Sequence, residues 1–241
     1  MNYIGSKLSL LEFIEEVILK EVETKENLIL CDIFSGTGVV GNYFKEKGYS
    51  VISNDIQYFS YVLAKAMIEN NGEIKFENLK KINIDDPFIY LNNIKGRKGF
   101  IYKNYCLEGT KNNEFQRLYF TDYNAKKIDA IRLKIKKWRK DGLITEKEYF
   151  YLIANLVEAS DKIANTASVY EAFLKDIKKT AQKELEMKPL ELNIQNNDCF
   201  YFATNEDADE LIEHISGDIL YLDPPYNSRK YDTNYHILET I

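Results

Sequence analysis

A glycine-rich loop between an apolar strand and a helix constrains the fold of this chain more than any other feature. The loop lies within Asp32–Gly41, which reads DIFSGTGVVG and so contains Gly-x-Gly-x-x-Gly. It follows the apolar segment Leu28–Phe34, which predicts a strand, and it opens the segment Val39–Lys47, which predicts a helix. Glycines permit the tight turn and let a ligand lie against bare backbone. The pattern therefore predicts a strand–loop–helix unit that binds a cofactor at the carboxyl end of the strand.

Two acidic residues beside this loop indicate which ligand it holds. Asp55 follows the next predicted strand, Ser50–Asn54, where such sites place an acid against a ribose. The loop alone is compatible with NAD, FAD or S-adenosylmethionine. Asp32 and Phe34 favour S-adenosylmethionine, because this ligand has an ammonium and a carboxylate instead of a pyrophosphate, and helix amides can donate to the carboxylate. The alternatives are a plain strand-to-helix turn for the loop and a strand-end cap for Asp32.

A proline loop near the end of the chain predicts the substrate side of the site. Asp223-Pro224-Pro225-Tyr226 follows the apolar run Ile219–Leu222, which predicts a buried strand of a parallel sheet. Consecutive prolines hold the loop extended and remove two backbone donors. A planar, amine-bearing base could stack on Tyr226 and direct its amino hydrogens at Asp223 and the Pro224 carbonyl. The alternative is a rigid turn that contains a tyrosine.

Composition sets the broad class of the protein. The 241 residues are 45% hydrophobic and 29% charged, which is typical of a globular chain. A net charge of −6 excludes a uniformly basic surface but not a local basic face that binds phosphates. The three cysteines and two histidines show no spacing for zinc or disulfides, so we expect a reduced, metal-free cytosolic protein. No run approaches the ~20 apolar residues of a membrane span, so no membrane partner is expected.

The chain divides into three blocks, 1–72, 73–188 and 189–241. The first block predicts a leading helix that includes Leu11 and Val22. The strand–loop–helix unit with the glycine-rich loop follows, and then a helix over Tyr58–Asn70. The last block predicts a strand, a helix and a strand over Leu190–Gln195, Ala208–Ile215 and Asp218–Leu222. This alternation predicts an α/β fold with a parallel sheet.

The middle block interrupts the alternation. Ile128, Ile131, Ile135 and Trp138 mark the apolar face of one helix, and a second helix is predicted over Tyr149–Ile163. An insertion of this length between strands of one sheet is usually functional.

Four motifs in a fixed order resemble one family. Asn2-Tyr3-Ile4-Gly5-Ser6-Lys7, Asp32–Gly38, Asn54-Asp55 and Asp223–Tyr226 resemble the Dam-like adenine-specific DNA methyltransferases. The resemblance implies a Rossmann-like S-adenosylmethionine-dependent methyltransferase sheet with a largely helical inserted target-recognition region. It also implies methyl transfer to the exocyclic amine of a flipped-out adenine, in the modification component of a restriction-modification system.

The resemblance assigns roles to individual residues. Those implied to bind the cofactor are Tyr3, Lys7, Asp32, Phe34, Gly36, Gly38, Asp55, Asp198 and Asp223. Those implied to hold the target adenine, and so to be catalytic, are Asp223, Pro224 and Tyr226. Asp198 is expected at the end of the third strand, where it would read the cofactor's adenine, and its alternative is an Asp that initiates a turn.

Double-stranded DNA is the expected partner. Lysines and arginines crowd the first helix of the middle block, from which Lys136 and Arg139 are predicted to contact phosphates. Arg229 and Lys230 follow the proline loop and are further candidates by position. The alternative for the helix is a solvated, lysine-rich face.

The sheet implied by the resemblance continues beyond the proline-loop strand. Only 15 residues follow Tyr226, whereas each further strand with its crossover needs about thirty. The expectation is a truncated or split enzyme with an open apolar edge, completed by a second chain. A cognate restriction endonuclease is the other expected partner. The alternatives are an inactive fragment that binds cofactor or DNA, and a methyltransferase for RNA or a protein amide.

Overall fold

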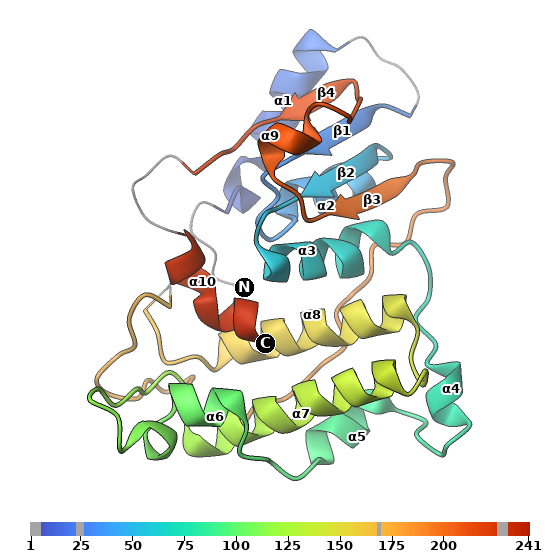
Figure 1. Cartoon of the computed structure of the whole chain (residues 1–241). Coiled ribbons are helices and arrows are strands. Elements are labelled where there is room, and N and C mark those ends of the chain that lie inside the picture. The colour runs from blue at the N-terminus through green and yellow to red at the C-terminus, as the bar shows by residue number, and fades with distance from the viewer. Residues whose placement is uncertain (1–5, 23–26, 168–169, 226–230) are drawn as a thin grey trace. The chain divides into compact units, whose positions relative to one another are not determined.

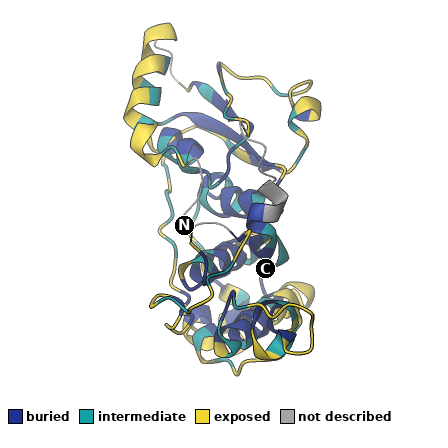
Figure 2. Ribbon diagram, turned by 90° about the vertical axis from the view of Figure 1, so that its left-hand side faces the viewer, coloured by how far each residue is buried: buried dark blue, intermediate teal, exposed yellow. Residues whose placement is uncertain are grey.

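The computed structural model describes residues 6–22, 27–167, 170–225 and 231–241, with side chains in the last segment from residue 234. The chain forms two compact units (Figure 1). The sheet unit comprises Tyr3–Glu73 and Glu191–Ser228. The helical unit comprises Ile74–Leu190 and Arg229–Ile241. In the ribbon of Figure 2, buried residues occur in both units.

The sheet unit is built on four parallel strands in the order β3-β2-β1-β4. The strands are β1 (Ile29–Asp32), β2 (Ser50–Asn54), β3 (Tyr201–Thr204) and β4 (Ile219–Tyr221). Its helical segments are η1 (Leu8–Leu10), α1 (Leu11–Glu21), α2 (Val39–Glu46), α3 (Tyr58–Ala64), the π-helix η2 (Lys65–Glu69) and α9 (Ala208–Leu211). The parallel α/β fold expected from the alternation is confirmed.

Apolar side chains cover the two faces of the sheet unequally. On one face, Leu30 and Ile219 pack with α2 and with the inner side of α1. On the other face, Cys31 and Ile52 pack with Leu211 of α9. The edge strands add exposed apolar side chains, so Phe202 of β3 is 53% exposed and Leu220 of β4 is 46% exposed. Among the residues that the structure describes, β4 pairs only with β1.

The third strand lies later in the chain than the sequence indicated. The predicted strand Leu190–Gln195 is wrong, because this fully described segment has no strand pairing. Side chains hold it instead: Gln195 N–H donates to Asn71 Oδ1 at 2.7 Å, and Asn193 Nδ2 donates to the Asn42 carbonyl at 3.1 Å. β3 at Tyr201–Thr204 pairs with β2 in its place.

The helical unit contains α4 (Glu77–Lys80), α5 (Pro87–Asn93), α6 (Phe100–Tyr105), η3 (Glu108–Thr110), α7 (Asp122–Lys140), α8 (Glu146–Lys162) and α10 (Tyr231–Thr240). The predicted apolar face of α7 is buried, with Ile128, Ile131 and Ile135 at 0% exposure. Helix α8 begins earlier than predicted because Thr145 and Glu148 form a capping box.

Helix α10 belongs to the helical unit although it follows the proline loop in the chain. The Asn234 carbonyl accepts the Tyr170 N–H at 2.8 Å, and the His236 ring contacts those of Tyr105 and Tyr119. No helix in the described part of the chain is long and apolar enough to cross a membrane.

Candidate active site

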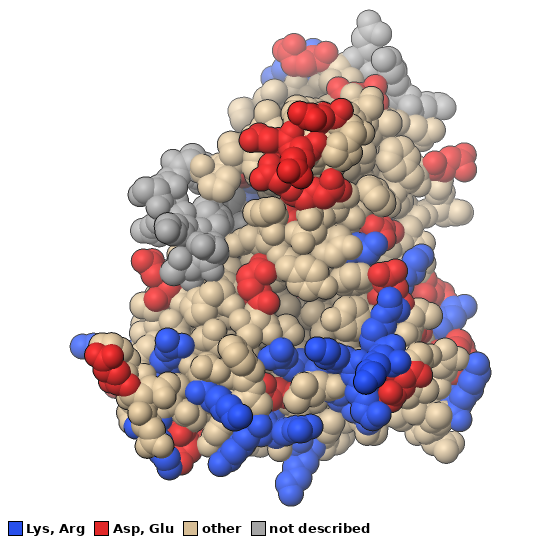
Figure 3. All heavy atoms as spheres, in the orientation of Figure 1, with Lys and Arg blue, Asp and Glu red and all other residues tan. Residues whose placement is uncertain are grey.

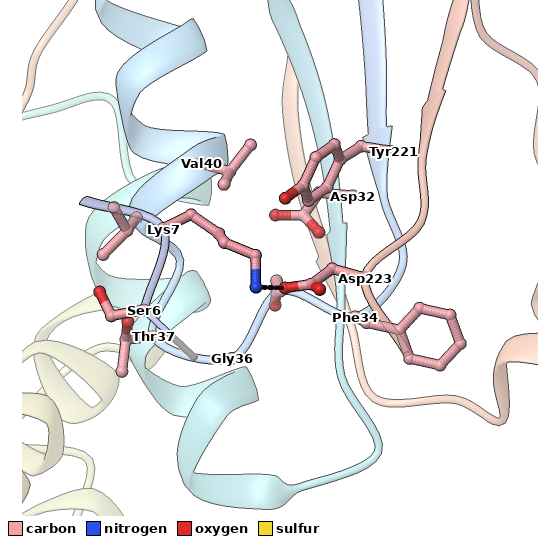
Figure 4. A pocket seen from close by; sticks show the side chains of 11 residues that line it. Ser6, Lys7, Asp32, Phe34, Gly36, Thr37, Val40, Tyr221 and Asp223 are labelled. Atoms are coloured by element: carbon pink, nitrogen blue, oxygen red, sulfur yellow. Dashed lines mark ion pairs between the residues drawn. The ribbon is translucent and has the colours of Figure 1, made fainter. Parts of the chain in front are cut away.

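A small cavity opens at the carboxyl ends of β1 and β4. Lys7, Asp32, Gly36, Tyr221 and Asp223 are among the residues that line its volume of about 30 Å³ (Figure 4). Strands β1 and β4 are parallel neighbours, with Asp32 paired to Tyr221. Because β2 lies on the other side of β1, the chain order reverses between β1 and β4. In open α/β sheets, ligands bind in the crevice at such a reversal.

The glycine loop adopts the conformation that its sequence predicts. Gly36 and Gly38 have φ of +54° and +73°, a region that favours glycine. Gly38 N–H donates to the Ser35 carbonyl at 2.8 Å, and Ser35 N–H donates to the Asn54 carbonyl at 2.8 Å. The loop is therefore a tight turn tied to the end of β2.

The third glycine of the motif allows close packing of α2. A Cβ atom at Gly41 would lie 2.8 Å from Ile68 Cδ1 and 3.2 Å from Val51 Cγ1. Ile68 belongs to η2, and the buried Lys45 holds the end of this π-helix by donating to the carbonyls of Ile68 and Asn70, each at 2.8 Å. The close approach of Ile68 and Val51 therefore leaves little room for a side chain at position 41.

Asp55 organises the loop from the end of β2. Its Oδ2 accepts the Gly36 N–H at 2.7 Å, and its Oδ1 accepts the Gln57 N–H at 2.9 Å. The side chain is 8% exposed.

Asn54 is a site residue whose role the sequence did not reveal. Its Nδ2 donates to the carbonyls of Ile33 and Glu206 at 3.2 and 3.1 Å. Its Oδ1 accepts from the Thr204 hydroxyl at 2.8 Å and the Glu206 N–H at 2.9 Å. One amide therefore ties together the carboxyl ends of β1, β2 and β3. The sequence signal that could have identified Asn54 is its position directly before Asp55.

Asp32 is a buried carboxylate without a hydrogen bond. It is 1% exposed, and neither oxygen has a partner within the described residues. Burial, together with the carboxylates of Asp55 and Asp223, raises the pKa of Asp32 from 3.8 to about 8. The backbone amides of Phe34 and Gly41 oppose this rise in pKa. A cationic ligand group would supply a charged partner for this buried carboxylate.

Asp223 forms an ion pair with Lys7. Lys7 Nζ lies 2.5 Å from Asp223 Oδ2, which brings the amino-terminal motif and the proline loop to one point (Figure 4). Tyr221 lies beside them, and burial with the charges of Asp223 and Asp32 raises its pKa to about 12. Pro224 and Pro225 are exposed, so the proline loop is open to solvent.

The structure places Asp198 away from this cavity. Asp198 precedes β3, so the expectation that it ends the third strand is wrong. It lines a different hollow, with Leu28 and Tyr49, at the opposite end of the sheet. The residues after β3 are Asn205 and Glu206, and Asn205 Nδ2 donates to the Asp55 carbonyl at 2.7 Å.

The structure describes some of the remaining predicted site residues and not others. Tyr3, Tyr226, Arg229 and Lys230 lie outside the described residues. The Phe34 ring points away from the Lys7–Asp223 ion pair (Figure 4). In the helical unit, Lys136 is exposed on α7, and Arg139 Nη2 lies 3.7 Å from Glu146 Oε1. No group of three potential metal ligands occurs in the described part of the chain.

Comparison with known proteins identifies the family. The profile of the D12 class N6 adenine-specific DNA methyltransferases matches residues 3–241. The chain is 43% identical, over all of its length and 69% of the relative, to the type II methyltransferase M.NlaIII of Neisseria lactamica. It is 46% identical over its whole length to the type II methyltransferase M.FokI of Planomicrobium okeanokoites, and spans 36% of that protein. The modification methylase StsI of Streptococcus sanguinis is 43% identical, and the chain again covers 36% of it.

The chain therefore belongs to the D12 class of N6 adenine-specific DNA methyltransferases, and the family resemblance of the sequence motifs is confirmed. It spans between about a third and two thirds of the length of these relatives. No solved structure matches the chain significantly.

Proposed function

We propose that this chain transfers a methyl group from S-adenosylmethionine to the N6 amine of an adenine flipped out of double-stranded DNA, as the modification component of a restriction-modification system. The observation that carries the proposal is the convergence of Asp32 and Asp223 on one cavity at the reversal of the sheet. Asp32 meets the cofactor's requirement for an anion, and Asp223 meets the substrate's requirement for a hydrogen-bond acceptor.

The residues of the cavity fit the cofactor. The Asp32 carboxylate has no partner within the described residues and would accept the ammonium of the methionine moiety. Asp55 lies beside the glycine loop and accepts the Gly36 N–H, and its carboxylate would hold the ribose hydroxyls. When bound, S-adenosylmethionine supplies an electrophilic methyl group and leaves as a neutral thioether. Tyr3 is proposed for the cofactor side on its place in the family motif.

The proline loop would orient the target amine. The lone pair of an adenine amine is delocalised into the ring, so it is a poor nucleophile. Hydrogen bonds from the amine to Asp223 and the Pro224 carbonyl favour a pyramidal nitrogen whose lone pair points at the methyl donor. Asp223 need not be a strong base, because the amine becomes acidic only as the new bond forms. Positioning and electrostatics then provide most of the rate acceleration.

The target adenine must leave the duplex to reach this loop. Flipping costs a few kcal/mol, and stacking on Tyr226 would return about 1–3 kcal/mol of it. We assign the segment 73–188 as the inserted target-recognition region, with Lys136, Arg139, Arg229 and Lys230 as phosphate contacts. The exposed Lys136 supports this assignment more directly than Arg139, which has an acidic partner.

The test is methyl transfer from labelled S-adenosylmethionine to genomic duplex DNA, followed by digestion to nucleosides. The label is expected in N6-methyldeoxyadenosine, with matched RNA and protein substrates unlabelled. Label in cytosine, or in RNA or protein alone, would refute the assignment of substrate. Failure to label any of the three substrates would refute activity of this chain.

A further inference from the structure

A basic loop in the helical unit carries none of the residues named above as phosphate contacts. The six residues 94–99 join α5 to α6 and read IKGRKG, with Lys95, Arg97 and Lys98 all exposed. Lys126, in the second turn of α7, lies against this loop. We call these four cations the α5–α6 basic cluster. Figure 3 shows Lys and Arg side chains gathered over the helical unit on the face drawn.

Helix α7 fixes the backbone of this loop at several points. The buried Lys127 donates through Nζ to the carbonyls of Asn92 and Ile94, at 2.5 and 2.7 Å. Arg97 N–H donates to the Lys126 carbonyl at 2.9 Å. Asp129, which is 0% exposed, accepts the N–H groups of Gly99, Ile101 and Tyr102 at 2.8 to 3.1 Å. The loop is therefore preorganised, so binding through it would lose little backbone entropy.

Two glycines allow the loop to approach α7 this closely. A Cβ atom at Gly96 would lie 2.9 Å from Lys126 Cβ, and one at Gly99 would lie 2.5 Å from the Asp129 carboxyl group. Side chains at these two positions would push the loop away from the helix. The alternation of glycine with cations thus places three cationic side chains on one short, fixed segment.

The charges of the cluster are concentrated and lack acidic partners among the residues that the structure describes. The ammonium groups of Lys98 and Lys126 lie 5.1 and 5.0 Å from the centroid of the same ring, that of Tyr102. No ion pair joins any of the four cations to an acid among the described residues, and the oxygens of nearby Asp129 accept backbone N–H groups. By contrast, the exposed Lys80, Lys137 and Lys188 pair with Glu77, Asp141 and Glu186 at 2.7 to 3.1 Å.

We propose that the α5–α6 basic cluster binds the phosphate backbone of duplex DNA, an inference that rests on the function proposed above and adds the surface that holds the substrate. Like charges collected around one ring favour a polyanion that can neutralise several of them at once. Arg97 can contact a phosphate in bidentate fashion, while the lysines act as point charges. The contacts are to the backbone, so they set affinity and position and carry no base specificity.

The test measures duplex binding as a function of salt, without cofactor. The variant carries Lys95→Gln, Arg97→Gln and Lys98→Gln, and the matched control carries Lys80→Gln, Lys137→Gln and Lys188→Gln. Each phosphate contact contributes about 0.9 to the slope of log affinity against log salt, so the variant's slope should be shallower by about 2–3. The control, which removes as many positive charges from acid-paired positions, should keep the wild-type slope.

Binding rather than turnover is the readout, so this test and that of the proposed function can fail separately. A folded variant with the wild-type slope would overturn the inference even if the chain methylates adenine. An equal loss of slope in the control would also overturn it, because net charge alone would then explain the effect. A second variant carries Lys98→Gln and Lys126→Gln and leaves Arg97 in place. If the two ammonium groups beside the Tyr102 ring bind phosphates as proposed, its slope should be shallower than that of the wild type by about 2.

Discussion

At the residue scale, the role proposed for Asp32 predicts that cofactor binding depends on pH. Its pKa of about 8 means that the unliganded site holds this carboxyl largely protonated at neutral pH. The ammonium of the cofactor binds the ionised form, so affinity should rise as pH rises from about 6 to about 8, and binding below pH 8 should release a proton. Calorimetric titration in buffers of different ionisation enthalpy measures this proton. Asp32→Asn should weaken binding and abolish the proton release, and a wild-type protein that releases none would contradict the role of Asp32.

The same residue predicts the pH dependence of stability in the opposite direction. The folded pKa of about 8 lies above the unfolded value of 3.8, so the unfolded state releases its proton first as pH rises. Without cofactor, the free energy of unfolding should therefore fall between about pH 4 and pH 8. Urea unfolding across this range should show the fall in the wild type and a flatter profile in Asp32→Asn. Equal slopes in the two proteins would contradict the raised pKa.

Asp55 holds the glycine loop, and a cofactor-binding role is proposed for it; one variant tests both roles. Asp55→Ala leaves the buried N–H groups of Gly36 and Gln57 without acceptors, so it should lower both stability and cofactor affinity. A lost charged hydrogen bond costs about 1.5–3 kcal/mol, which corresponds to roughly tenfold to a hundredfold in cofactor affinity. Duplex affinity, measured by anisotropy, should change less. Unchanged cofactor affinity in calorimetry would leave Asp55 with only its structural role.

At the element scale, close packing between α2 and η2 predicts a rescue experiment. Gly41→Ala would place a methyl group 2.8 Å from Ile68 Cδ1 and should cost about 1–3 kcal/mol of stability through overpacking. Ile68→Val removes Cδ1, so the double variant should be more stable than the sum of the single changes predicts. Urea unfolding of all four proteins measures this coupling energy. Additive effects would show that the contact does not limit the approach of the helix.

The elements around the glycine loop could be predicted from sequence because their signals are local. The apolar strand, the glycines with positive φ and the acid after β2 each specify a conformation within a few residues of themselves. The third strand could not be located in this way. Leu190–Gln195 and Tyr201–Thr204 are both short and partly apolar, and only pairing with β2 distinguishes them. Asp198 was misplaced as a consequence, because its predicted role depended on which of these segments entered the sheet.

The contacts between distant segments at the candidate site could not be predicted from local sequence signals either. The motifs containing Lys7 and Asp223 predicted a shared site, but not that the two side chains form an ion pair. Asp32 is buried and lacks a hydrogen-bond partner among the described residues. Both properties arise from the fold and could not be predicted from the sequence. The α5–α6 basic cluster could not be predicted from the sequence, because its cations are divided between a loop and α7 and only the fold brings them together.

At the scale of the whole molecule, exposed apolar side chains on the edge strands predict self-association. Phe202 and Leu220 lie on β3 and β4, on the sheet face that α9 covers in part. Edge strands with apolar, solvent-facing side chains tend to pair with other chains, and lysine at such positions discourages this. The mass in solution should therefore rise with protein concentration, and Phe202→Lys with Leu220→Lys should suppress the rise. Phe115→Lys, which replaces a 71% exposed side chain in the helical unit, is the control. Sedimentation that shows a wild-type monomer at all concentrations would contradict the prediction.

In the proposed function, the cavity between β1 and β4 performs methyl transfer with Asp223 as a catalytic acceptor. The most direct measurement compares methyl transfer to duplex DNA by the wild type, Asp223→Ala and Asp223→Asn, with duplex affinity measured in parallel. Loss of a positioned hydrogen-bond partner should lower turnover by about 10²–10³-fold. Duplex affinity should stay at the wild-type value, because the proposed role has Asp223 contact an amine and no phosphate. Turnover near the wild-type rate in both variants would contradict the account.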